Sequence, residues 1–325
     1  MASARSSYSI FVLVGEFKLF GPEPGMWPVA QMEAVRCRYN CNVESPGKQS
    51  RVTIQQVRRW SSDGQCLAML TCYDATTAAW LWRGGVKLLL VGDTAARFIL
   101  GHDSTLPVGM DFMVAITAAV RRGAPAAFIM ADMPFGSYQC GDDLAVGNAM
   151  RFLTEGAADA VKMELDATFA PLVKRMTSAG IPVVAHLGSR PQQKRLAGPS
   201  SRRVYRSNAQ VAQTVDTACQ MVDSGAVMIL LEAVPSEVST GVVNAVAGSG
   251  PDDKPVLVIG CGAGPACHGH VVVLHDLLGL TAWQPPFASP LLDLGAQIER
   301  AAKKWVDLVA SGRYLAEGHP YKLQP

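Results

Sequence analysis

Charged residues are scarce in this sequence, and neither sign of charge dominates. Only 17% of its 325 residues are charged, and the formal net charge is +2. This balance gives no reason to expect nucleic acid or an anionic membrane as a partner. No apolar run approaches the roughly 20 residues that a membrane-spanning helix requires. Hydrophobic residues make up 49% of the chain, which predicts a globular protein with a large buried core.

Several patterns that would point to a particular chemistry are also missing. No Gly-x-Gly-x-x-Gly motif follows the first predicted strand, which argues against a dinucleotide-binding fold. Cys261, Cys267, His268 and His270 lie close together, but their spacing fits no zinc-binding pattern. The eight cysteines lack the spacing of a disulfide-stabilised scaffold, and most lie in or beside apolar runs. This usage favours a reducing compartment, and we expect a cytoplasmic protein.

Residues 1–50 differ from the rest of the chain. They contain four prolines and show no sustained hydrophobic period. We expect a poorly structured N-terminal extension, and Met26 and Met32 are alternative start sites. Residues 51–325 are then expected to form a single catalytic domain.

Apolar runs that end on an ionisable residue recur through this domain. The run Val86–Val91 is followed by Gly92 and Asp93. The same arrangement occurs at Ala127–Ala131 before Asp132, Ala160–Val161 before Lys162 and Glu164, Val183–Ala185 before His186, and Val227–Leu231 before Glu232. Continuous apolar runs bounded by turn residues predict strands that are buried on both faces. Parallel α/β folds bind ligands at the carboxyl ends of their strands, where these ionisable residues would lie.

The order of strands and helices predicts the fold class. Seven strands alternate with helical segments at a spacing of roughly 25–45 residues, which indicates a parallel sheet of βα units. This number of units favours a closed (β/α)8 TIM barrel over an open doubly wound sheet. The eighth strand is assigned to Trp283–Ala288, and Gly269–Leu278 is assigned to a helix. A short helix beginning at Ile54 and capped by Thr53 is expected to cover one end of the core.

Two later helices complete the prediction. Asn208 is the expected N-cap of a helix that runs to about Asp223. Leu291–Ala310 is predicted to be a long amphipathic helix, because its apolar residues recur at helical spacing.

Three carboxylates follow three successive predicted strands. Asp93, Asp132 and Glu164 would lie side by side at the barrel mouth. They would repel one another unless a cation lay between them. A set of oxygen ligands suits Mg²⁺, which usually keeps water or substrate oxygens in its coordination shell. We therefore predict a magnesium site; for any one carboxylate alone, a helix cap or loop salt bridge is the alternative.

Three further residues are candidates for chemistry in the same cavity. Lys162 shares a face of its strand with Glu164, and its charge suits a substrate carboxylate; a Schiff base is the competing role. His186 is more often a hydrogen-bonding residue than a metal ligand at such a place, and we expect it to contact substrate. Glu232 lies two strands further round the barrel, where it suits a general base.

The glycine-rich run Ile259–Gly264 follows the seventh predicted strand. In a barrel this position can hold a phosphate group. The alternative is a tight turn that allows another group to approach the backbone closely.

Several motifs together resemble ketopantoate hydroxymethyltransferase (3-methyl-2-oxobutanoate hydroxymethyltransferase). They occur in the family's order over about residues 52–323, and Gly101–Pro107 (Gly-His-Asp-Ser-Thr-Leu-Pro) is the most specific of them. The others are Val91–Thr94, Ala119–Ala124, Ala131–Phe135, Val161–Lys162 with Glu164, His186–Gly188, Leu231–Pro235, and Ile259–Gly264 with His275–Asp276.

The resemblance implies a barrel of the phosphoenolpyruvate/pyruvate superfamily that assembles as a decameric homo-oligomer. It implies Mg²⁺ held by Asp93, Asp132 and Glu164, with the 2-oxo acid near Thr94 and Lys162. Glu232 matches the family's proton acceptor. The implied reaction transfers a one-carbon unit from 5,10-methylenetetrahydrofolate to 3-methyl-2-oxobutanoate in pantothenate biosynthesis, through a Mg²⁺-stabilised enolate.

This sequence departs from the family pattern at four places. Thr94 replaces serine, Ala115–Ile116 replaces an aromatic–histidine pair, and Cys261 replaces an aliphatic residue. The largest change is at 198–206, where the family's usual Gly-Gly-Tyr…Gly-Arg loop is absent. This change motivates an alternative, a divergent Mg²⁺-dependent aldolase-type enzyme acting on another 2-oxo acid. An inactive metabolite-binding paralogue is a further alternative.

Overall fold

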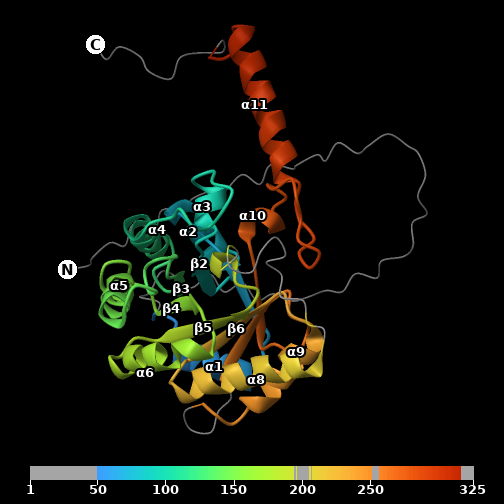
Figure 1. Cartoon of the computed structure of the whole chain (residues 1–325). Coiled ribbons are helices and arrows are strands. Elements are labelled where there is room, and N and C mark those ends of the chain that lie inside the picture. The colour runs from blue at the N-terminus through green and yellow to red at the C-terminus, as the bar shows by residue number, and fades with distance from the viewer. Residues whose placement is uncertain (1–49, 194, 196–204, 206, 251–255, 316–325) are drawn as a thin grey trace, which may run out of the picture. The chain divides into compact units, whose positions relative to one another are not determined.

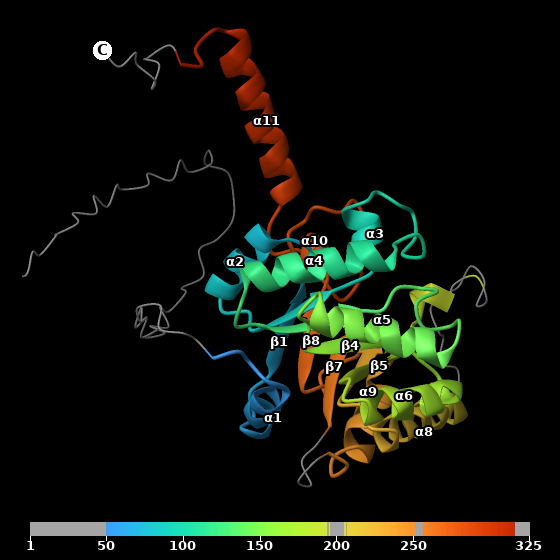
Figure 2. The ribbon, with the colours of Figure 1, turned by 90° about the vertical axis from the view of Figure 1, so that its left-hand side faces the viewer.

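A closed barrel of eight parallel strands forms the described part of the chain (Figures 1 and 2). The computed structural model describes residues 50–193, 195, 205, 207–250 and 256–315. All of these residues belong to one compact unit of the chain, which begins at Lys48. The expected (β/α)8 fold is confirmed. The expected extension over 1–50 lies, apart from Ser50, outside the described residues.

The strands follow one another round the barrel in chain order, and β8 closes it against β1. The strands are β1 Leu67–Thr71, β2 Leu88–Val91, β3 Phe128–Asp132, β4 Ala160–Glu164, β5 Val183–Gly188, β6 Met228–Glu232, β7 Leu257–Cys261 and β8 Gly269–Val272. The helices are α1 Ile54–Ser62, α2 Ala75–Arg83, α3 Ala95–Phe98, α4 Met110–Gly123, α5 Asp142–Thr154, α6 Ala170–Ser178, α8 Asn208–Asp223, α9 Ser236–Ala245, α10 Leu274–Leu277 and α11 Leu294–Ala310. None of these helices is long and apolar enough to cross a membrane.

Side chains alternate between the barrel interior and the helix layer along each strand. On β3, Phe128 and Met130 pack in the interior, whereas Ile129 and Ala131 pack outward against helices. The next interior position is Asp132, at the carboxyl end of the strand. The same two-residue period directs Lys162 and Glu164 of β4, His186 of β5, Glu232 of β6 and Cys261 of β7 into the barrel mouth.

The short N-terminal helix α1 covers the end of the barrel away from this mouth (Figure 2). The hydroxyl of Thr53 accepts a hydrogen bond from the backbone N–H of Gln56, as expected for its N-cap. Val57 is fully buried and, with Val52, packs against the interior side chains of the strands. The sequence prediction for α1 is therefore confirmed.

The prediction for the eighth strand is wrong. Gly269–Val272 is the strand, where a helix was expected, and it pairs in parallel with β1 and β7. Its two β-branched valines favour extended backbone. The segment 283–288 forms no strand, and Pro285 and Pro286 in it have no backbone N–H to donate to a neighbouring strand.

Two predicted helix boundaries also need comment. Ser207, not Asn208, is the N-cap of α8, because the Ser207 hydroxyl accepts from the N–H of Gln210. The last helix α11 begins at Leu294, where Asp293 caps it, rather than at Leu291. None of its residues is buried, so it contributes no side chain to the barrel core.

Helices α2 and α4 approach each other closely where α4 ends at Gly123. A Cβ atom added at Gly123 would overlap the carbonyl oxygen of Ala75, at the start of α2. Gly147, in the middle of α5, has open space at the same position. The two glycines therefore provide a matched pair for testing the helix packing.

We expect Gly123→Ala to lower the free energy of unfolding by about 1–3 kcal/mol, because α2 must shift to relieve the overlap. Gly147→Ala should raise it by about 0.5–1 kcal/mol, because alanine favours the helix and meets no neighbour. Urea unfolding of both variants checks the pair. Equal effects of the two substitutions would contradict this packing.

Candidate active site

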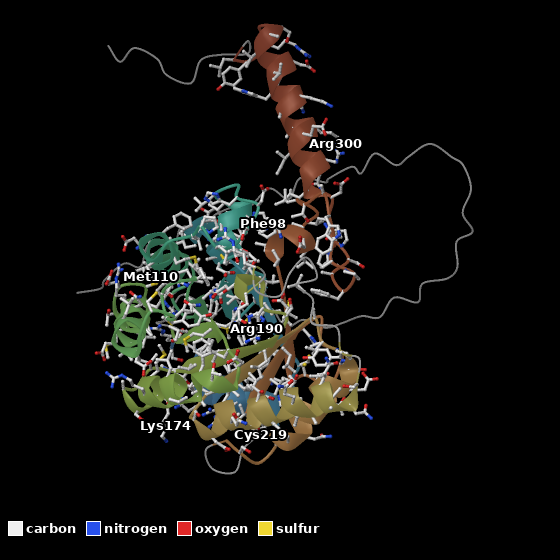
Figure 3. The ribbon with its side chains drawn as sticks, in the orientation of Figure 1. Phe98, Met110, Lys174, Arg190, Cys219 and Arg300 are labelled. Carbon is white, nitrogen blue, oxygen red and sulfur yellow. The ribbon has the colours of Figure 1, made fainter. Side chains whose placement is uncertain are left out.

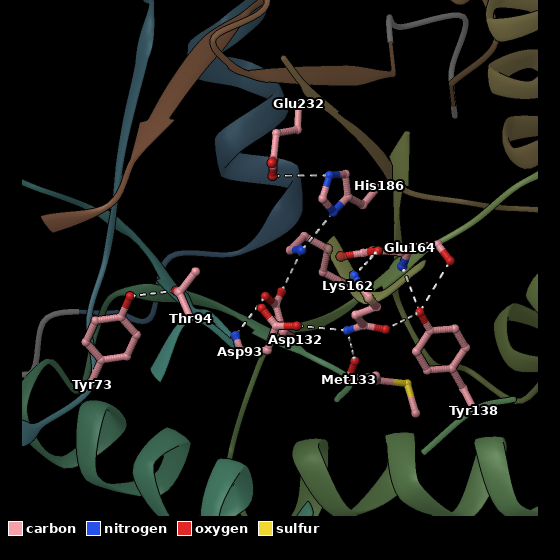
Figure 4. A network of polar contacts seen from close by, with 11 residues as sticks. Tyr73, Asp93, Thr94, Asp132, Met133, Tyr138, Lys162, Glu164, His186 and Glu232 are labelled. Atoms are coloured by element: carbon pink, nitrogen blue, oxygen red, sulfur yellow. Dashed lines mark hydrogen bonds and ion pairs between the residues drawn. The ribbon is translucent and has the colours of Figure 1, made fainter. Parts of the chain in front are cut away.

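The predicted ionisable residues converge on one cavity at the carboxyl ends of the strands. The cavity has a volume of about 760 Å³, and Asp93, Asp132, Lys162, Glu164, His186 and Glu232 line its inner end. Figure 4 shows them joined by a network of polar contacts. Asp132 comes from β3, Lys162 and Glu164 from β4, and Asp93 from the turn after β2.

Lys162 and Asp132 form a buried ion pair at the centre of this network. The Nζ of Lys162 lies 2.9 Å from Oδ1 of Asp132, and both side chains are almost fully buried. Burial by itself would lower the pKa of Lys162, but Asp132, Asp93 and Glu164 raise it above its ordinary value. The other oxygen of Asp132, Oδ2, accepts a hydrogen bond of 3.0 Å from the backbone N–H of Asp93.

Negative charge at the inner end exceeds what Lys162 neutralises. Burial, followed by the nearby charge of Asp132, raises the pKa of Asp93 to about 6. Burial, followed by the charge of Asp93, raises the pKa of Glu164 well above its ordinary value. Two buried carboxyl groups are thus destabilised in their charged forms. A cation bound among them would relieve this destabilisation.

His186 connects the ion pair to Glu232 on the next strand. The ammonium group of Lys162 donates to Nδ1 of His186 over 3.1 Å, which leaves the ring proton on Nε2. Burial, with the charge of Lys162, holds the pKa of His186 well below its ordinary value, so the ring is neutral. Its Nε2 lies 3.4 Å from Oε2 of Glu232, toward which it points (Figure 4).

Glu232 has the properties of a proton acceptor near neutral pH. Its pKa is raised to about 7, mainly by burial and also by Asp93 and Asp132, while Lys162 opposes the shift. Its side chain keeps 27% of its surface exposed, in contrast to 2% for His186. Glu232 is therefore open to the cavity, where a substrate can approach it.

Gln192 is a residue of the site that the sequence analysis missed. It lies in the short 3-10 turn η2 (Pro191–Gln193) after β5 and is almost fully buried. Its Nε2 donates to Asp93 Oδ2 and to the carbonyl oxygen of Met133, each over 3.0 Å. Its backbone N–H donates to Glu164 Oε2, also over 3.0 Å. Gln192 therefore bridges two of the predicted metal ligands.

A tyrosine fixes the orientation of Gln192. The hydroxyl of Tyr138 donates to Gln192 Oε1 over 2.7 Å and accepts from the backbone N–H of Glu164 over 3.2 Å. The carbonyl of the amide is thus satisfied, and its NH₂ group is directed at Asp93. The only sequence signal for this role is a polar residue that directly follows a proline, a few positions after a predicted strand.

Thr94 is held at the edge of the site by Tyr73. The two hydroxyl oxygens are 2.8 Å apart, and either can donate to the other (Figure 4). The structure thus places Thr94 beside Asp93 in the cavity wall, where the sequence analysis expected it. The altered segment 198–206 lies outside the described residues, apart from Tyr205.

The donor groups suit an ion that takes only part of its shell from protein. Among the described residues, no three His, Cys, Asp or Glu side chains converge closely enough to hold a metal by themselves. Gln192 and Lys162 occupy the spaces between the carboxylates. Asp132 Oδ1 is buried and faces the ammonium group of Lys162, without a hydrogen bond of regular geometry. Oxygen donors with excess negative charge fit Mg²⁺, which completes its shell with water or substrate.

The glycine-rich turn after β7 is packed against a side chain. Gly262 has a φ of +65°, and a Cβ atom there would overlap the ring of Phe287. This supports the tight-turn interpretation of Ile259–Gly264 over a phosphate cradle. His268 also accepts a hydrogen bond from the N–H of Val258, through Nδ1, within the fold.

Comparison with known proteins places these features in a family. The family model described as ketopantoate hydroxymethyltransferase matches residues 51–317. The 3-methyl-2-oxobutanoate hydroxymethyltransferase of Mycobacterium tuberculosis (strain ATCC 25618 / H37Rv) is 36% identical over 276 residues, covering 85% of this chain and 95% of that protein. The enzyme of the same name from Mycobacterium marinum is 36% identical over 271 residues, covering 83% and 88%.

Solved structures support the same type of barrel. A crystal structure of 2,3-dimethylmalate lyase, a PEP mutase/isocitrate lyase superfamily member, matches with a TM-score of 0.53 at 17% identity, covering 80% of this chain and 86% of that chain. A phosphonopyruvate hydrolase in complex with oxalate and Mg²⁺ matches with a TM-score of 0.53 at 13% identity, covering 83% and 92%. These two likenesses concern the fold alone. From the family model and the sequence relatives, this chain belongs to the ketopantoate hydroxymethyltransferase family.

Proposed function

We propose that this chain transfers a hydroxymethyl group from 5,10-methylenetetrahydrofolate to 3-methyl-2-oxobutanoate, giving 2-dehydropantoate for pantothenate biosynthesis. Family membership supports a hydroxymethyltransferase. The observation that carries the proposal is the position of Glu232. A carboxyl group with a pKa of about 7 faces the same cavity as a group of buried carboxylates whose negative charge Lys162 neutralises only in part. Glu232 suits the role of a base, and the buried carboxylates suit a cation that binds a 2-oxo acid.

The substrate is an anion, and Lys162 provides the positive charge for it. The ammonium group lies in the cavity wall and contacts Asp132 and His186. The hydroxyl of Thr94, oriented by Tyr73, is a second hydrogen-bonding group for the substrate oxygens. We infer that these two residues orient the 2-oxo acid, with Asp93, Asp132 and His186 also in contact with it.

We infer that Asp93 and Asp132 hold Mg²⁺ directly and that Glu164 acts through a water molecule. The hydrogen bonds from Gln192 to Asp93 and Glu164 keep these two carboxylates apart, which favours an outer position for Glu164. A bound Mg²⁺ would stabilise the negative charge that develops on the oxygens of the 2-oxo acid.

Glu232 removes the proton from C3 of the substrate in this proposal. The hydrogen is weakly acidic because the neighbouring ketone delocalises the electron pair as an enolate. His186 lies beside this carboxylate, with its Nε2 3.4 Å from Oε2 of Glu232. The enolate carbon then forms a C–C bond to the one-carbon unit. The two C–N bonds of 5,10-methylenetetrahydrofolate break, and water supplies the hydroxyl group. The proton held by Glu232 and the second proton of that water form the two N–H groups of the tetrahydrofolate that is released.

We also propose a cytoplasmic homo-oligomer, with the decamer of the family as the expected assembly. Helix α11 presents exposed apolar side chains, including Ile298, Trp305 and Val309, that a second copy of the chain can cover. The cysteines of the described part of the chain are unpaired, which fits a reducing compartment.

Exchange of the C3 proton of 3-methyl-2-oxobutanoate in heavy water, followed by NMR, tests the proposed function. The wild-type protein should catalyse Mg²⁺-dependent exchange, and its rate should rise with pH until Glu232 is ionised, with a midpoint at or below about 7. Glu232→Gln should lower the exchange rate by about 10²–10⁴-fold while keeping the affinity for Mg²⁺ and the acid.

Glu237→Gln provides the matched control, because Glu237 is exposed on α9. Its exchange rate should equal that of the wild type. Wild-type exchange by Glu232→Gln would rule out Glu232 as the base. A folded wild-type protein without any exchange would favour a different 2-oxo acid or a binding role.

Asp93→Asn should stabilise the protein when no metal is present. The folded-state pKa of Asp93 is raised from about 4 to about 6, so the wild type loses stability as pH rises through this interval. Asparagine avoids this loss while its Oδ1 can still accept from Gln192. Above pH 7 the expected gain is about 3 kcal/mol, and chemical denaturation in the presence of a chelator measures it.

The same variant should lose most of the stabilisation that Mg²⁺ and 2-oxo acid give to the wild type. Two results would contradict the assignment of Asp93. One is wild-type affinity for Mg²⁺ in calorimetry, and the other is a metal-free variant that is less stable than the wild type above pH 7.

A further inference from the structure

Each of the three carboxylates predicted to serve the metal site has one oxygen that already accepts an N–H of the protein. Oδ2 of Asp93 accepts from the side-chain NH₂ group of Gln192, and Oε2 of Glu164 accepts from the backbone N–H of Gln192, each over 3.0 Å. Oδ2 of Asp132 accepts from the backbone N–H of Asp93, also over 3.0 Å. At most one oxygen of each carboxylate is therefore left for an ion, unless one of these hydrogen bonds breaks.

Gln192 supplies two of these three hydrogen bonds, and its surroundings fix which way its amide points. The residue is only 4% exposed. Besides Asp93, its NH₂ group donates to the carbonyl oxygen of Met133 over 3.0 Å. Rotation of the amide by half a turn would place the amide oxygen against both of these acceptors. The NH₂ group is therefore the end of the amide that must face them.

Tyr138 favours the same orientation from the other end of the amide. Its hydroxyl lies 2.7 Å from Oε1 of Gln192 and accepts from the backbone N–H of Glu164 over 3.2 Å (Figure 4). Because this N–H occupies a lone pair of the hydroxyl, the hydroxyl proton is available for Oε1. The tyrosine is buried, and its ring packs edge-on against Phe169 with 5.9 Å between ring centroids. The group that orients Gln192 is thus itself held in place.

The turn that carries Gln192 is tied to the segment after β4. Arg190, which is labelled in Figure 3, lies two residues before Gln192. Its guanidinium group donates to the carbonyl oxygen of Leu165 over 3.2 Å and to the carboxylate of Asp166 over 2.7 Å. Both of these residues directly follow Glu164 at the end of β4. Gln192 therefore cannot move away from Glu164 without the loss of these contacts.

Two common divalent cations place different demands on such a set of carboxylates. Ca²⁺ takes about 6–8 oxygen ligands at roughly 2.3–2.6 Å and often binds both oxygens of one carboxylate. Mg²⁺ is smaller, binds oxygens at roughly 2.0–2.1 Å and keeps several water molecules. A carboxylate with one oxygen already engaged can still serve Mg²⁺. The same carboxylate can bind Ca²⁺ through both oxygens only if its hydrogen bond breaks.

We propose that Gln192, oriented by Tyr138, makes this site selective for Mg²⁺ over Ca²⁺. Gln192 is a positioning residue that binds neither ion. It keeps one oxygen of Asp93 and one oxygen of Glu164 from turning toward a shared ion. Without its hydrogen bonds these two carboxylates can offer both of their oxygens, which suits the larger ion. This inference rests on the magnesium site of the proposed function and adds the residues that determine which ion the site accepts.

Calorimetry of the full chain, with MgCl₂ and CaCl₂ in separate titrations at pH 8, tests this selectivity. In the wild type the Kd for Ca²⁺ should exceed the Kd for Mg²⁺ by about tenfold or more. Gln192→Leu keeps the size of the side chain but removes its NH₂ group, so the ratio of the two Kd values should fall by about tenfold. Gln193→Leu is the matched control, because Gln193 belongs to the same turn but is only half-buried. Its ratio should equal that of the wild type.

Tyr138→Phe gives a second and milder test, because Gln192→Leu also leaves the carbonyl oxygen of Met133 without its donor. Phenylalanine keeps the ring contact with Phe169 but removes the hydroxyl that orients the amide. The ratio of the Kd values should therefore fall by about threefold, as expected for the loss of one hydrogen bond. Tyr314→Phe, at an exposed position after α11, loses a hydroxyl far along the chain and should leave the ratio unchanged.

The outcomes separate this inference from the proposed function. The fall in the ratio should come from tighter Ca²⁺ binding, and equal weakening of both ions would overturn the inference, because Gln192 would then only support the structure of the site. A wild-type ratio in both Gln192→Leu and Tyr138→Phe would also overturn it, as would a wild type that binds neither ion or prefers Ca²⁺. A failure of the proposed function is seen separately, as selective Mg²⁺ binding by a wild type that does not catalyse C3 proton exchange.

Discussion

The buried ion pair between Lys162 and Asp132 is the interaction on which the site depends. One ammonium group faces several carboxyl groups at the closed end of a cavity. Buried charges that lack a partner are costly, so the carboxyl groups beyond the pair retain protons up to higher pH than usual. Lys162 also donates to His186, which keeps the ring neutral and directs its Nε2–H to Glu232. Burial and the charge of Lys162 thus act together on the protonation of both sides of the site.

The excess of carboxyl groups suits a bound cation but lowers the stability of the metal-free protein. The excess negative charge destabilises the metal-free protein, and the closed barrel around it must supply the stability that is lost. Gln192 limits the cost, because its backbone N–H and its NH₂ group donate to Glu164 and Asp93 and keep these carboxylates apart. The result, among the described residues, is a site that favours a cation without a complete set of protein ligands.

Much of this site could be predicted from the sequence, because the two-residue period of a strand shows which side chains face the barrel interior. Once 128–131 is recognised as a buried strand, Asp132 must face the interior, and the same argument holds for Lys162, Glu164 and Glu232. The eighth strand could not be found in this way. Four residues that begin with glycine give too short a pattern, and only pairing with β1 and β7 makes Gly269–Val272 a strand.

Contacts between distant segments are likewise hidden in the sequence. Gln192 follows Asp93 by 99 positions, and nothing in either local pattern indicates that the two side chains bond. The same holds for Tyr138, whose hydroxyl reaches Gln192 and Glu164 from the segment after β3. Such residues become visible only when the barrel brings the strand ends together.

The most direct test of this account is the number of protons released when Mg²⁺ binds together with the 2-oxo acid. Calorimetry at pH 6.5 in buffers of different ionisation enthalpy measures it. Because the pKa values of Asp93 and Glu164 are raised in the metal-free protein, we expect Mg²⁺ binding to release protons at pH 6.5, and the number released should fall as the pH rises. Binding without proton release at pH 6.5 would contradict the account, because the carboxylates would then already be fully ionised.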